Sequence, residues 1–311
     1  MQFAGSHILS IAQFERGDVE QIFAVADRMA PYAQRQRVTR VLDGAILGSM
    51  FFEPSTRTRV SFGSAFNLLG GEVRETTGFE NSAIAKGESL YDTARVLSGY
   101  SDVITMRHPQ EGSVAEFAAA SRVPVINGGD GSNEHPSQAL LDLYTIRSEI
   151  VARGRSLDQL RIAMVGDLRF GRTVHSLCKL LGLFQGVQIV FVSPEALSMP
   201  VEIVENLRET GHQVLESDQL EKSIAHVDIV YSTRIQEERF SSQEEADLYR
   251  GRFRLNQSIY THNCEPNTVI MHPLPRDSRA NARELDDDLN DNPNLAIFRQ
   301  TDNGVLVRMA L

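Results

Sequence analysis

Apolar, β-branched runs alternate with helical patterns along most of the chain, and this alternation restricts the fold more than any other feature. Parallel strands need a long crossover between them, usually a helix, so the pattern is typical of a parallel sheet covered by helices on both faces. The alternation occurs twice, after an amphipathic helix that carries Val19, Ile22, Phe23, Ala26 and Met29. The strand candidates are 45–52, 72–76, 103–106 and 123–126 in the first series, and 161–166, 187–192, 213–215, 227–231 and 267–271 in the second.

A strong helical pattern from Pro136 to about Ala152 separates the two series, with proline where it suits the first turn of a helix. The chain has 311 residues, which exceeds the size at which a single hydrophobic core usually divides. The sequence therefore predicts an α/β protein of two domains, each a parallel β-sheet flanked by helices on both faces, joined by helix 136–152. The charged run 237–252 is weakly patterned and predicts a mobile loop.

The charge of the chain restricts its partners. With 41 acidic and 31 basic residues the formal net charge is −10, which argues against nucleic acid or an anionic membrane as the main partner. No apolar run approaches the ~18 residues of a membrane span, and the start Met1-Gln-Phe-Ala lacks a signal sequence, so a cytoplasmic location is predicted. Cys178 falls on an apolar helical stripe, which indicates a packed core thiol, and together with Cys264 it forms no metal or disulfide pattern.

The segment Ser55-Thr-Arg-Thr-Arg59 indicates an anion site at the start of a helix. It follows a strand candidate and precedes a helical pattern that ends at Gly70-Gly71, with Ser55 as the expected N-cap. The first N–H groups of a helix have no partner within it and carry the positive end of the dipole, so a phosphate there would gain backbone, hydroxyl and Arg57 donors. A helix cap that binds nothing is the alternative, but two arginines in a first turn oppose the dipole and favour a bound anion.

Four further strand candidates end in polar side chains. Ligands of open α/β sheets bind beyond the carboxyl ends of the strands, so these endings are expected to form the site. They are Met106-Arg107-His108-Pro, Asn127-Gly-Gly-Asp-Gly-Ser-Asn-Glu-His135-Pro-Ser-Gln138, Thr233-Arg234-Ile-Gln236 and His272-Pro-Leu274-Pro275-Arg276.

The second series also contains a competing motif, Gly166-Asp-Leu-Arg-Phe-Gly171-Arg172-Thr173, which nearly matches a phosphate loop. Arg172 stands where that loop has its lysine, and the inner glycine of a dinucleotide loop is missing. A carboxylate ligand for Arg172 fits this loop better than a nucleotide does. A nucleotide-dependent protein nevertheless stays an alternative, and magnesium-dependent ATP binding would favour it.

Together these residues resemble the aspartate/ornithine carbamoyltransferase family over nearly the whole chain. The motifs shared with the family are Ser55-Thr-Arg-Thr-Arg, Met106-Arg-His-Pro, His135-Pro-Ser-Gln and His272-Pro-Leu-Pro. The stretch Gly166-Asp-Leu-Arg-Phe-Gly-Arg-Thr-Val-His-Ser and Thr233-Arg-Ile-Gln are similar to the aspartate branch. The ornithine branch typically has Cys where Ser137 stands, an Asp-x-x-x-Ser-Met-Gly loop and a Cys within His-Cys-Leu-Pro, and this chain has none of these. The resemblance implies carbamoyl transfer from carbamoyl phosphate to L-aspartate in pyrimidine synthesis, with no cofactor and no metal.

The resemblance also implies a role for each polar strand ending. The first domain, 1–135 with about 291–311, would bind carbamoyl phosphate, and the second, 153–290, would bind aspartate. The implied phosphate ligands are Ser55, Thr56, Arg57, Thr58 and Arg107, and the implied ligands of the carbonyl oxygen are Thr58, Arg107 and His135. Gln138 and the carbonyls of Leu274 and Pro275, with a cis bond before this proline, would orient the carbamoyl NH2. The implied aspartate ligands are Arg172, Thr173, Arg234, Gln236 and Lys86. Glu53 is expected to pair with Arg172 and Arg234, and the leaving phosphate is the expected proton acceptor.

The loop from Asn81 to Glu88 bears on assembly. A solvated turn is its plain interpretation, but in the family the matching Ser82 and Lys86 reach the active site of a neighbouring chain. The resemblance thus implies a homotrimer with shared sites, with Lys86 among the catalytic residues beside Thr58, Arg107 and His135. The sequence leaves open whether separate regulatory chains enlarge this trimer. A non-catalytic relative is the remaining alternative, and it is disfavoured because these site residues are all present.

Overall fold

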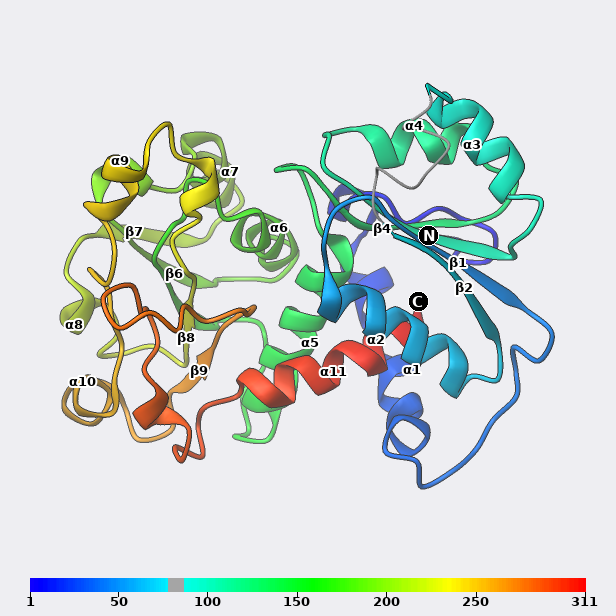
Figure 1. Cartoon of the computed structure of the whole chain (residues 1–311). Coiled ribbons are helices and arrows are strands. Elements are labelled where there is room, and N and C mark those ends of the chain that lie inside the picture. The colour runs from blue at the N-terminus through cyan, green and yellow to red at the C-terminus, as the bar shows by residue number, and fades with distance from the viewer. Residues whose placement is uncertain (78–86) are drawn as a thin grey trace. The chain divides into compact units, whose positions relative to one another are not determined.

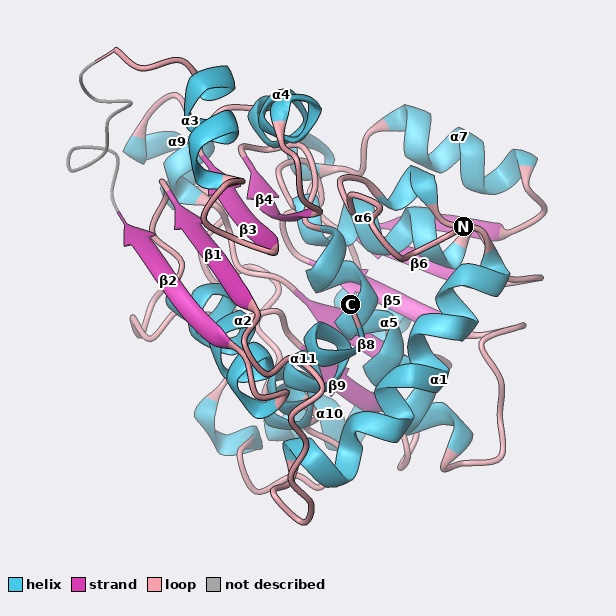
Figure 2. Cartoon of the chain, turned by 90° about the vertical axis from the view of Figure 1, so that its right-hand side faces the viewer, coloured by secondary structure: helices cyan, strands magenta, loops and turns pink. Residues whose placement is uncertain are grey.

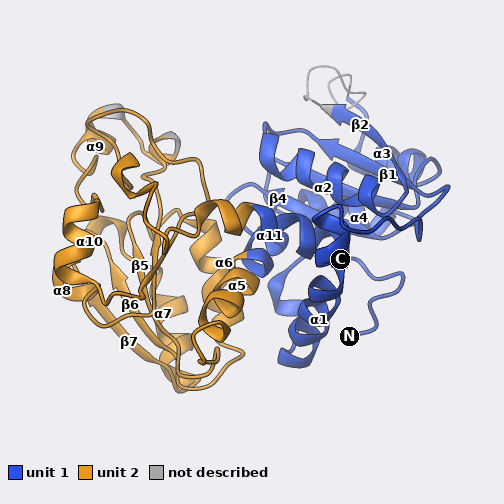
Figure 3. Cartoon of the chain, turned by 90° about the horizontal axis from the view of Figure 1, so that it is seen from below, with its two compact units in different colours: residues 1–141, 302–311 blue, residues 142–301 orange. Residues whose placement is uncertain are grey.

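A computed structural model of the chain describes residues 1–77 and 87–311 (Figure 1). The chain forms two compact units, coloured separately in Figure 3: unit 1 contains residues 1–141 and 302–311, and unit 2 contains residues 142–301. The border at 141/142 lies within the helix that the sequence predicted between the two series of strands. Among the described residues, no helix is both long and apolar enough to cross a membrane.

Unit 1 is built on a four-stranded parallel sheet with the order β2-β1-β3-β4 (Figure 2). The strands are β1 (Ile46–Phe51), β2 (Glu72–Thr77), β3 (Val103–His108) and β4 (Val125–Asp130). The helices that belong to this unit alone are α1 (Arg16–Ala33), α2 (Thr56–Leu68), α3 (Leu90–Leu97) and α4 (Ser113–Ala120), after the short 3-10 turn η1 (Ile11–Gln13). Two helices, α5 (Pro136–Val151) and α11 (Ile297–Ala310), contribute residues to both units.

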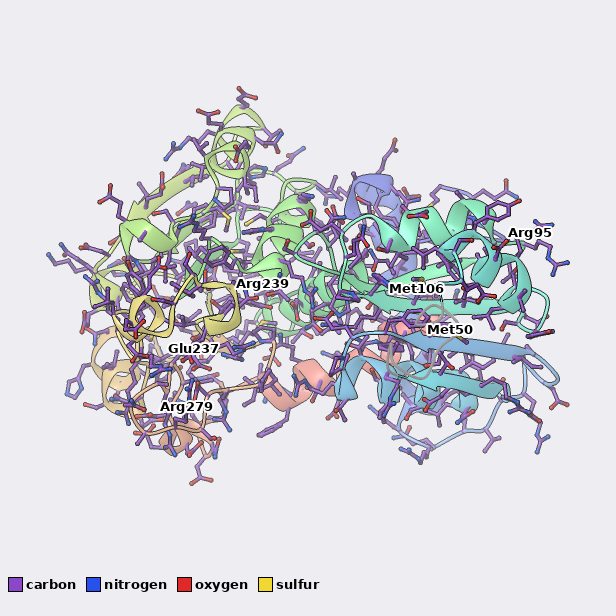
Figure 4. All side chains as sticks on the ribbon, turned by 45° about the horizontal axis from the view of Figure 1, so that its top comes forward. Met50, Arg95, Met106, Glu237, Arg239 and Arg279 are labelled. Carbon is purple, nitrogen blue, oxygen red and sulfur yellow. The ribbon has the colours of Figure 1, made fainter. Side chains whose placement is uncertain are left out.

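The two faces of this sheet carry separate apolar clusters. Met50 and Met106, both labelled in Figure 4, are partners in the β1–β3 register. They pack with Phe117 of α4 and Ala94 of α3. On the other side, Ala65 and Leu69 at the end of α2 pack with Met309 of α11 and residues of α1. Alternate residues of a strand point to opposite faces, and the strand residues Met50, Ile104 and Met106 all belong to the first cluster, whereas the second is made of helix and loop residues.

Unit 2 is built on a five-stranded parallel sheet with the order β7-β6-β5-β8-β9. The strands are β5 (Arg161–Val165), β6 (Gln188–Val192), β7 (Gln213–Ser217), β8 (Ile229–Ser232) and β9 (Val269–Met271). The helices are α6 (Arg172–Leu181), α7 (Val201–Glu209), α8 (Leu220–Ser223), α9 (Gln243–Asp247) and α10 (Gln257–Asn263), with the 3-10 turns η3 (Glu195–Leu197), η4 (Glu237–Arg239) and η5 (Asp287–Leu289).

The core of unit 2 follows the same principle. Ala163 and Val165 of β5 face a cluster that includes Ile224 and Tyr260, while Met164 points the other way, where its sulfur is 3.5 Å from Cys178 Sγ of α6. Cys178 is fully buried, which confirms the prediction of a core thiol, and burial raises its pKa far above the ordinary value. The prediction of two parallel sheets, each covered by helices on both faces, is therefore confirmed.

Two predictions of local structure were wrong. The strand expected over 123–126 runs from Val125 to Asp130, because its Gly-rich end pairs with β3 and Asn127 Nδ2 donates a 2.9 Å hydrogen bond to the Leu9 carbonyl. The segment 237–252, predicted as a loop, contains η4 and α9. There Glu237 accepts hydrogen bonds from Arg250 at 2.6 Å and Arg279 at 3.1 Å, and Figure 4 labels Glu237 and Arg279. Tertiary contacts thus shaped both segments against weak local patterning.

Candidate functional site

The anion site predicted at the start of α2 lies beyond the carboxyl end of β1. Ser55 occupies the N-cap position, as predicted, but its side chain makes no capping hydrogen bond to the helix. The side chains of Thr56 and Arg57 are exposed, whereas Thr58 is buried with 5% of its surface exposed. The first turn of α2 therefore offers backbone, hydroxyl and guanidinium donors at one helix end, where the dipole favours an anion.

Thr58 and His135, which are 77 positions apart in the sequence, meet in this unit. The Thr58 Oγ1 and His135 Nε2 atoms are 3.3 Å apart and buried, and the Ser137 hydroxyl lies 3.5 Å from the other ring nitrogen, Nδ1. His135 directly precedes α5, and Gln138 lies in the first turn of that helix and is half-buried. A histidine held at both nitrogens by hydroxyl groups can donate a hydrogen bond from a fixed position.

Arg107, the second-last residue of β3, has only 8% of its surface exposed. Its Nε donates to Glu53 Oε2 at 3.0 Å, and one terminal nitrogen donates to the Gly128 carbonyl of β4 at 3.2 Å. A side chain at Gly128 would sit 3.2 Å from the Met106 carbonyl, so glycine allows the two strands to approach closely here. The pair between Glu53 and Arg107 was not predicted; the sequence had suggested other arginines as partners of Glu53.

Sequence reasoning missed two carboxylates that support the turn before His135. Asp130 accepts hydrogen bonds from the Gly112 N–H at 3.1 Å and from the Glu134 N–H at 3.2 Å. Glu134 accepts from the Ile11 N–H at 2.7 Å and is 4% exposed. Acidic residues inside a Gly-rich strand ending were the available signal, since a buried carboxylate needs donors around it.

In unit 2, the endings of the neighbouring strands β5 and β8 are joined by Asp167. This carboxylate is fully buried and accepts from the Phe170 N–H at 3.0 Å and from the Gln236 N–H at 3.1 Å. The Gln236 side chain in turn donates to the Phe170 carbonyl at 2.6 Å. Gly166 has a φ of +118°, and a side chain there would sit 2.3 Å from the Thr233 carbonyl, so only glycine fits.

This arrangement places Arg172, Thr173, Arg234 and Gln236 at the ends of two adjacent strands. Arg172 and Thr173 begin α6, and Arg234 donates to the neighbouring Ile235 carbonyl at 3.2 Å. The loop 166–171 uses its Phe170 N–H for its own carboxylate, whereas a phosphate loop directs its N–H groups to the ligand. The structure therefore disfavours the nucleotide alternative for this motif.

The turn after β9 carries Leu274 and Pro275. The peptide bond between them is cis, as the resemblance implied, and Leu274 has a φ of +58°. His272 is 1% exposed, and its Nδ1 accepts a hydrogen bond from the Leu274 N–H at 2.9 Å. Its other ring nitrogen lies 2.8 Å from Glu284 Oε1, although the geometry is not that of a hydrogen bond.

Two histidines beside the site are held in the neutral form. Burial lowers the pKa of His108, which follows Arg107 and accepts from the Gln110 N–H at 3.1 Å. Burial also lowers the pKa of His175 in α6, whose Nε2 lies 2.7 Å from the Leu168 carbonyl. These imidazoles support the loops that carry the site.

The remaining predicted site residues, Ser82 and Lys86, lie outside the described residues. In residues 1–77 and 87–311, no group of three or more His, Cys, Asp or Glu side chains could hold a metal ion. A hollow of about 660 Å³ lies at the opposite, amino-terminal edge of the unit 2 sheet, lined by Arg155, Gln159, Arg161, Gly186, Gln188 and Gln213. Both arginines there are paired with Asp228, so this hollow is separate from the polar strand endings.

Comparison with known proteins identifies relatives for the whole chain. Residues 6–148 match the aspartate/ornithine carbamoyltransferase, carbamoyl-P binding domain, and residues 158–311 match the Asp/Orn binding domain of the same family. The chain is 80% identical to the aspartate carbamoyltransferase catalytic subunit of Saccharophagus degradans over 311 residues, which cover 100% of this chain and 92% of that protein. It is 43% identical to the catalytic subunit of Methanosarcina mazei, over 100% of this chain and 97% of the other.

Solved structures agree with these relatives. The catalytic subunit of Methanocaldococcus jannaschii aspartate transcarbamoylase superimposes with a TM-score of 0.89 at 43% identity, covering 98% of this chain and 96% of that one. The Trypanosoma cruzi enzyme in complex with carbamoyl phosphate and aspartate superimposes with a TM-score of 0.89 at 37% identity, covering 98% and 95% of the two chains.

Proposed function

The chain belongs to the aspartate/ornithine carbamoyltransferase family, and we propose that its polar strand endings transfer the carbamoyl group of carbamoyl phosphate to the α-amino group of L-aspartate. The products are N-carbamoyl-L-aspartate and phosphate, in pyrimidine synthesis. One observation of the structure carries this proposal. Three buried donors, Thr58, Arg107 and His135, lie at or beyond the carboxyl ends of the neighbouring strands β1, β3 and β4 of one sheet.

The reaction needs donors more than it needs a base. When the amine attacks the carbonyl carbon, the carbonyl oxygen becomes negative, and phosphate then leaves as an anion. Donors that are already in place and shielded from water stabilise such charges most strongly. We assign Thr58, Arg107 and His135 to the carbonyl oxygen, and Ser55, Thr56 and Arg57, with Thr58 and Arg107, to the phosphate. The leaving phosphate accepts the amine proton.

The remaining contacts of carbamoyl phosphate come from two turns. Gln138 at the start of α5 and the carbonyls of Leu274 and Pro275 are suited to orient the carbamoyl NH2, since this group offers donors for oxygen acceptors. We therefore assign carbamoyl phosphate mainly to residues 1–135 and about 291–311, with 136–152 as the connecting helix.

Aspartate is assigned to residues 153–290. Its two carboxylates match the forked guanidinium groups of Arg172 and Arg234, with Gln236 and Thr173 beside them. The neighbouring carboxylate Asp167 accepts from the backbone N–H groups of Phe170 and Gln236 and so holds the two loops that carry these ligands. The side chain of ornithine ends in an amine and has no second carboxylate for this pair of cations.

The proposal is tested by phosphate release. Purified protein is mixed with carbamoyl phosphate and, in separate reactions, L-aspartate, D-aspartate, L-glutamate or L-ornithine. Phosphate release above the spontaneous rate is expected with L-aspartate alone, and N-carbamoyl-L-aspartate should appear in equal amount. Equal rates with ornithine, or no release with any amino acid, would contradict the assignment.

We also propose that the active protein is a cytoplasmic homotrimer in which Ser82 and Lys86 complete the site of a neighbouring subunit. An acidic protein needs a concentrated positive charge to hold a dianionic phosphate, and a lysine from a second chain adds one. Cyclic symmetry would repeat the same contact at each interface.

Complementation tests the shared site. Lys86→Ala and His135→Ala chains are each expected to be nearly inactive, but trimers refolded from a mixture should regain activity, because some sites then draw every donor from intact chains. A Lys222→Ala chain, altered at the end of α8 in unit 2, is the matched control and should remain active alone. Absence of recovery in verified mixed trimers would show that each site is built within one chain.

A further inference from the structure

A network of hydrogen bonds between buried polar groups crosses unit 2 behind the proposed site residues. Asp142 of α5 accepts a hydrogen bond from the Tyr231 hydroxyl at 2.7 Å and another from Gln300 Nε2 at 2.6 Å. Gln300 of α11 then accepts, through Oε1, the His272 N–H at 3.1 Å. Asp142 and Tyr231 are 0% exposed, and Gln300 and His272 are 1% exposed. This hydrogen-bond network therefore joins α5, β8, α11 and the residue that follows β9.

The two ends of this hydrogen-bond network lie near residues that we assign to substrate binding. Tyr231 lies three positions before Arg234, and Thr173 is near enough to its hydroxyl to influence the pKa of the phenol. At the other end, His272 starts the turn of Leu274 and Pro275, because its ring accepts the Leu274 N–H. The same buried carboxylate thus lies behind an aspartate-binding strand ending and a carbamoyl-binding turn.

Asp142 is costly to bury, so its position calls for a reason beyond packing. A carboxylate removed from water must be fully supplied with donors, and apolar residues of similar volume often serve stability equally well. Burial and the nearby Asp142 charge raise the pKa of Tyr231, so this phenol stays protonated and donates a hydrogen bond to Asp142.

The direction of the hydrogen bonds depends on the charge of Asp142. An ionised carboxylate only accepts, so Gln300 must present its NH2 group to Asp142 and its carbonyl oxygen to the His272 N–H. If the side chain at 142 could donate, Gln300 could turn over and place its NH2 group against the His272 N–H. Two donors would then face each other at the start of the turn.

We propose that Asp142 and Gln300 are positioning residues, which hold the turn 272–276 so that the Leu274 carbonyl points at the carbamoyl group. This inference rests on the proposed function for its kinetic consequence, but its structural consequence can be measured without activity. Both residues are buried, and both act through the His272 backbone.

The test uses a reversal of the hydrogen-bond direction. In Asp142→Asn the side chain gains a donor and Gln300 can turn over. In Gln300→Glu two carboxylates face each other. In the double variant the introduced amide at position 142 donates to the introduced carboxylate at position 300, whose other oxygen again accepts the His272 N–H. The original direction at the turn is thereby restored with the same number of charges.

Two measurements are made on the 311-residue wild-type chain and the three variants. Hydrogen exchange over 272–276 reports only the N–H groups of His272, Leu274 and Arg276, because the two prolines have none. Exchange should be faster in both single variants and return to the wild-type rate in the double variant. The kcat/KM for carbamoyl phosphate should fall about 10- to 100-fold in the single variants, as expected for a small misplacement of a substrate contact, and recover in the double variant.

The inference is overturned if the double variant exchanges as fast as the single variants, or if Asp142→Asn exchanges like wild type. Wild-type protein that shows no carbamoyl transfer would contradict the proposed function, while the exchange pattern would still decide the positioning role. Loss of thermal stability without the pattern of single-variant loss and double-variant recovery would indicate a role in folding alone and would also overturn it.

Discussion

The two units prepare their parts of the site in different ways. In unit 1 three of the proposed catalytic side chains, Thr58, Arg107 and His135, are buried; Thr58 lies against His135, and Arg107 donates to Glu53. In unit 2 the proposed aspartate ligands Arg172, Arg234 and Gln236 are only partly buried. There the support comes mainly from Asp167, which binds the backbone of both loops.

This difference corresponds to two chemical tasks. Stabilising a developing charge requires donors that are fixed and shielded from water before the reaction starts. Recognising an amino acid requires selective contacts with groups whose charge does not change, and partly exposed arginines can make them. Unit 1 is therefore expected to control the rate of the chemical step, and unit 2 the affinity for the amino acid.

The largest expected effect comes from Arg57 in unit 1. Arg57→Ala should lower kcat at least about 100-fold, the scale for losing one donor to a developing anion, while the fold is kept. Steady-state phosphate release measures kcat, and circular dichroism checks the fold. Arg95→Ala, an exposed position of α3 in the same unit, is the matched control and should stay close to wild type. A folded Arg57→Ala protein with unchanged kcat would remove Arg57 from the mechanism.

The next effect should appear in the affinity of unit 2. Arg234→Ala is expected to raise the KM for aspartate by about 10- to 100-fold, because one charge-assisted contact to a carboxylate is lost. Carbamoyl phosphate binding, measured by calorimetry without aspartate, should barely change. Arg252→Ala, an exposed position of the same unit, serves as control. Equal weakening of both ligands would show that the units do not divide the substrates.

A matched pair of carboxylates sharpens the contrast between the units. Asp167→Ala and Asp130→Ala each remove an acceptor of backbone N–H groups, and each should lower the free energy of unfolding by about 1–3 kcal/mol. Asp167→Ala should raise the KM for aspartate, whereas Asp130→Ala should weaken carbamoyl phosphate binding. Urea unfolding and steady-state kinetics measure the two properties. The division fails if both variants change the same KM.

The smallest expected effect concerns pH. Burial lowers the pKa of His175 below its ordinary 6.5, so the unfolded chain takes up this proton at a higher pH than the folded chain does. The contribution of neutral His175 to the free energy of unfolding is therefore fully present above pH 6.5 and is lost as the pH falls through the folded-state pKa. In His175→Gln, which can still donate to the Leu168 carbonyl, the fall in stability below pH 6.5 should be shallower, by at most about 1.4 kcal/mol per pH unit.

His108→Gln provides the corresponding measurement in unit 1, where burial lowers the histidine pKa in the same direction. Both variants are compared with wild type by urea unfolding at each pH. A slope that is the same in wild type and both variants would mean that other groups cause the acid sensitivity.

Much of the fold could be predicted because the local signals were strong. The apolar runs around β1, β5 and β6 could hardly be anything but buried strands, and Pro136 marked the start of α5 to the residue. The strand β4 was misplaced, since Asn127 to Asp130 have low strand propensity and their pairing depends on β3 and Leu9. Helices η4 and α9 were missed for the same reason.

By itself the sequence determined which residues stand near the carboxyl ends of the strands, except at β4, because periodicity and the helix-start signals are local properties of the chain. Only the tertiary structure decided how those residues are supported. The contacts of Glu53 with Arg107, of Asp167 with Gln236 and of Asp142 with Gln300 span 54, 69 and 158 positions. Such contacts leave no periodic trace, since the donor and acceptor types involved occur on every protein surface, and only folding shows which of them are buried together.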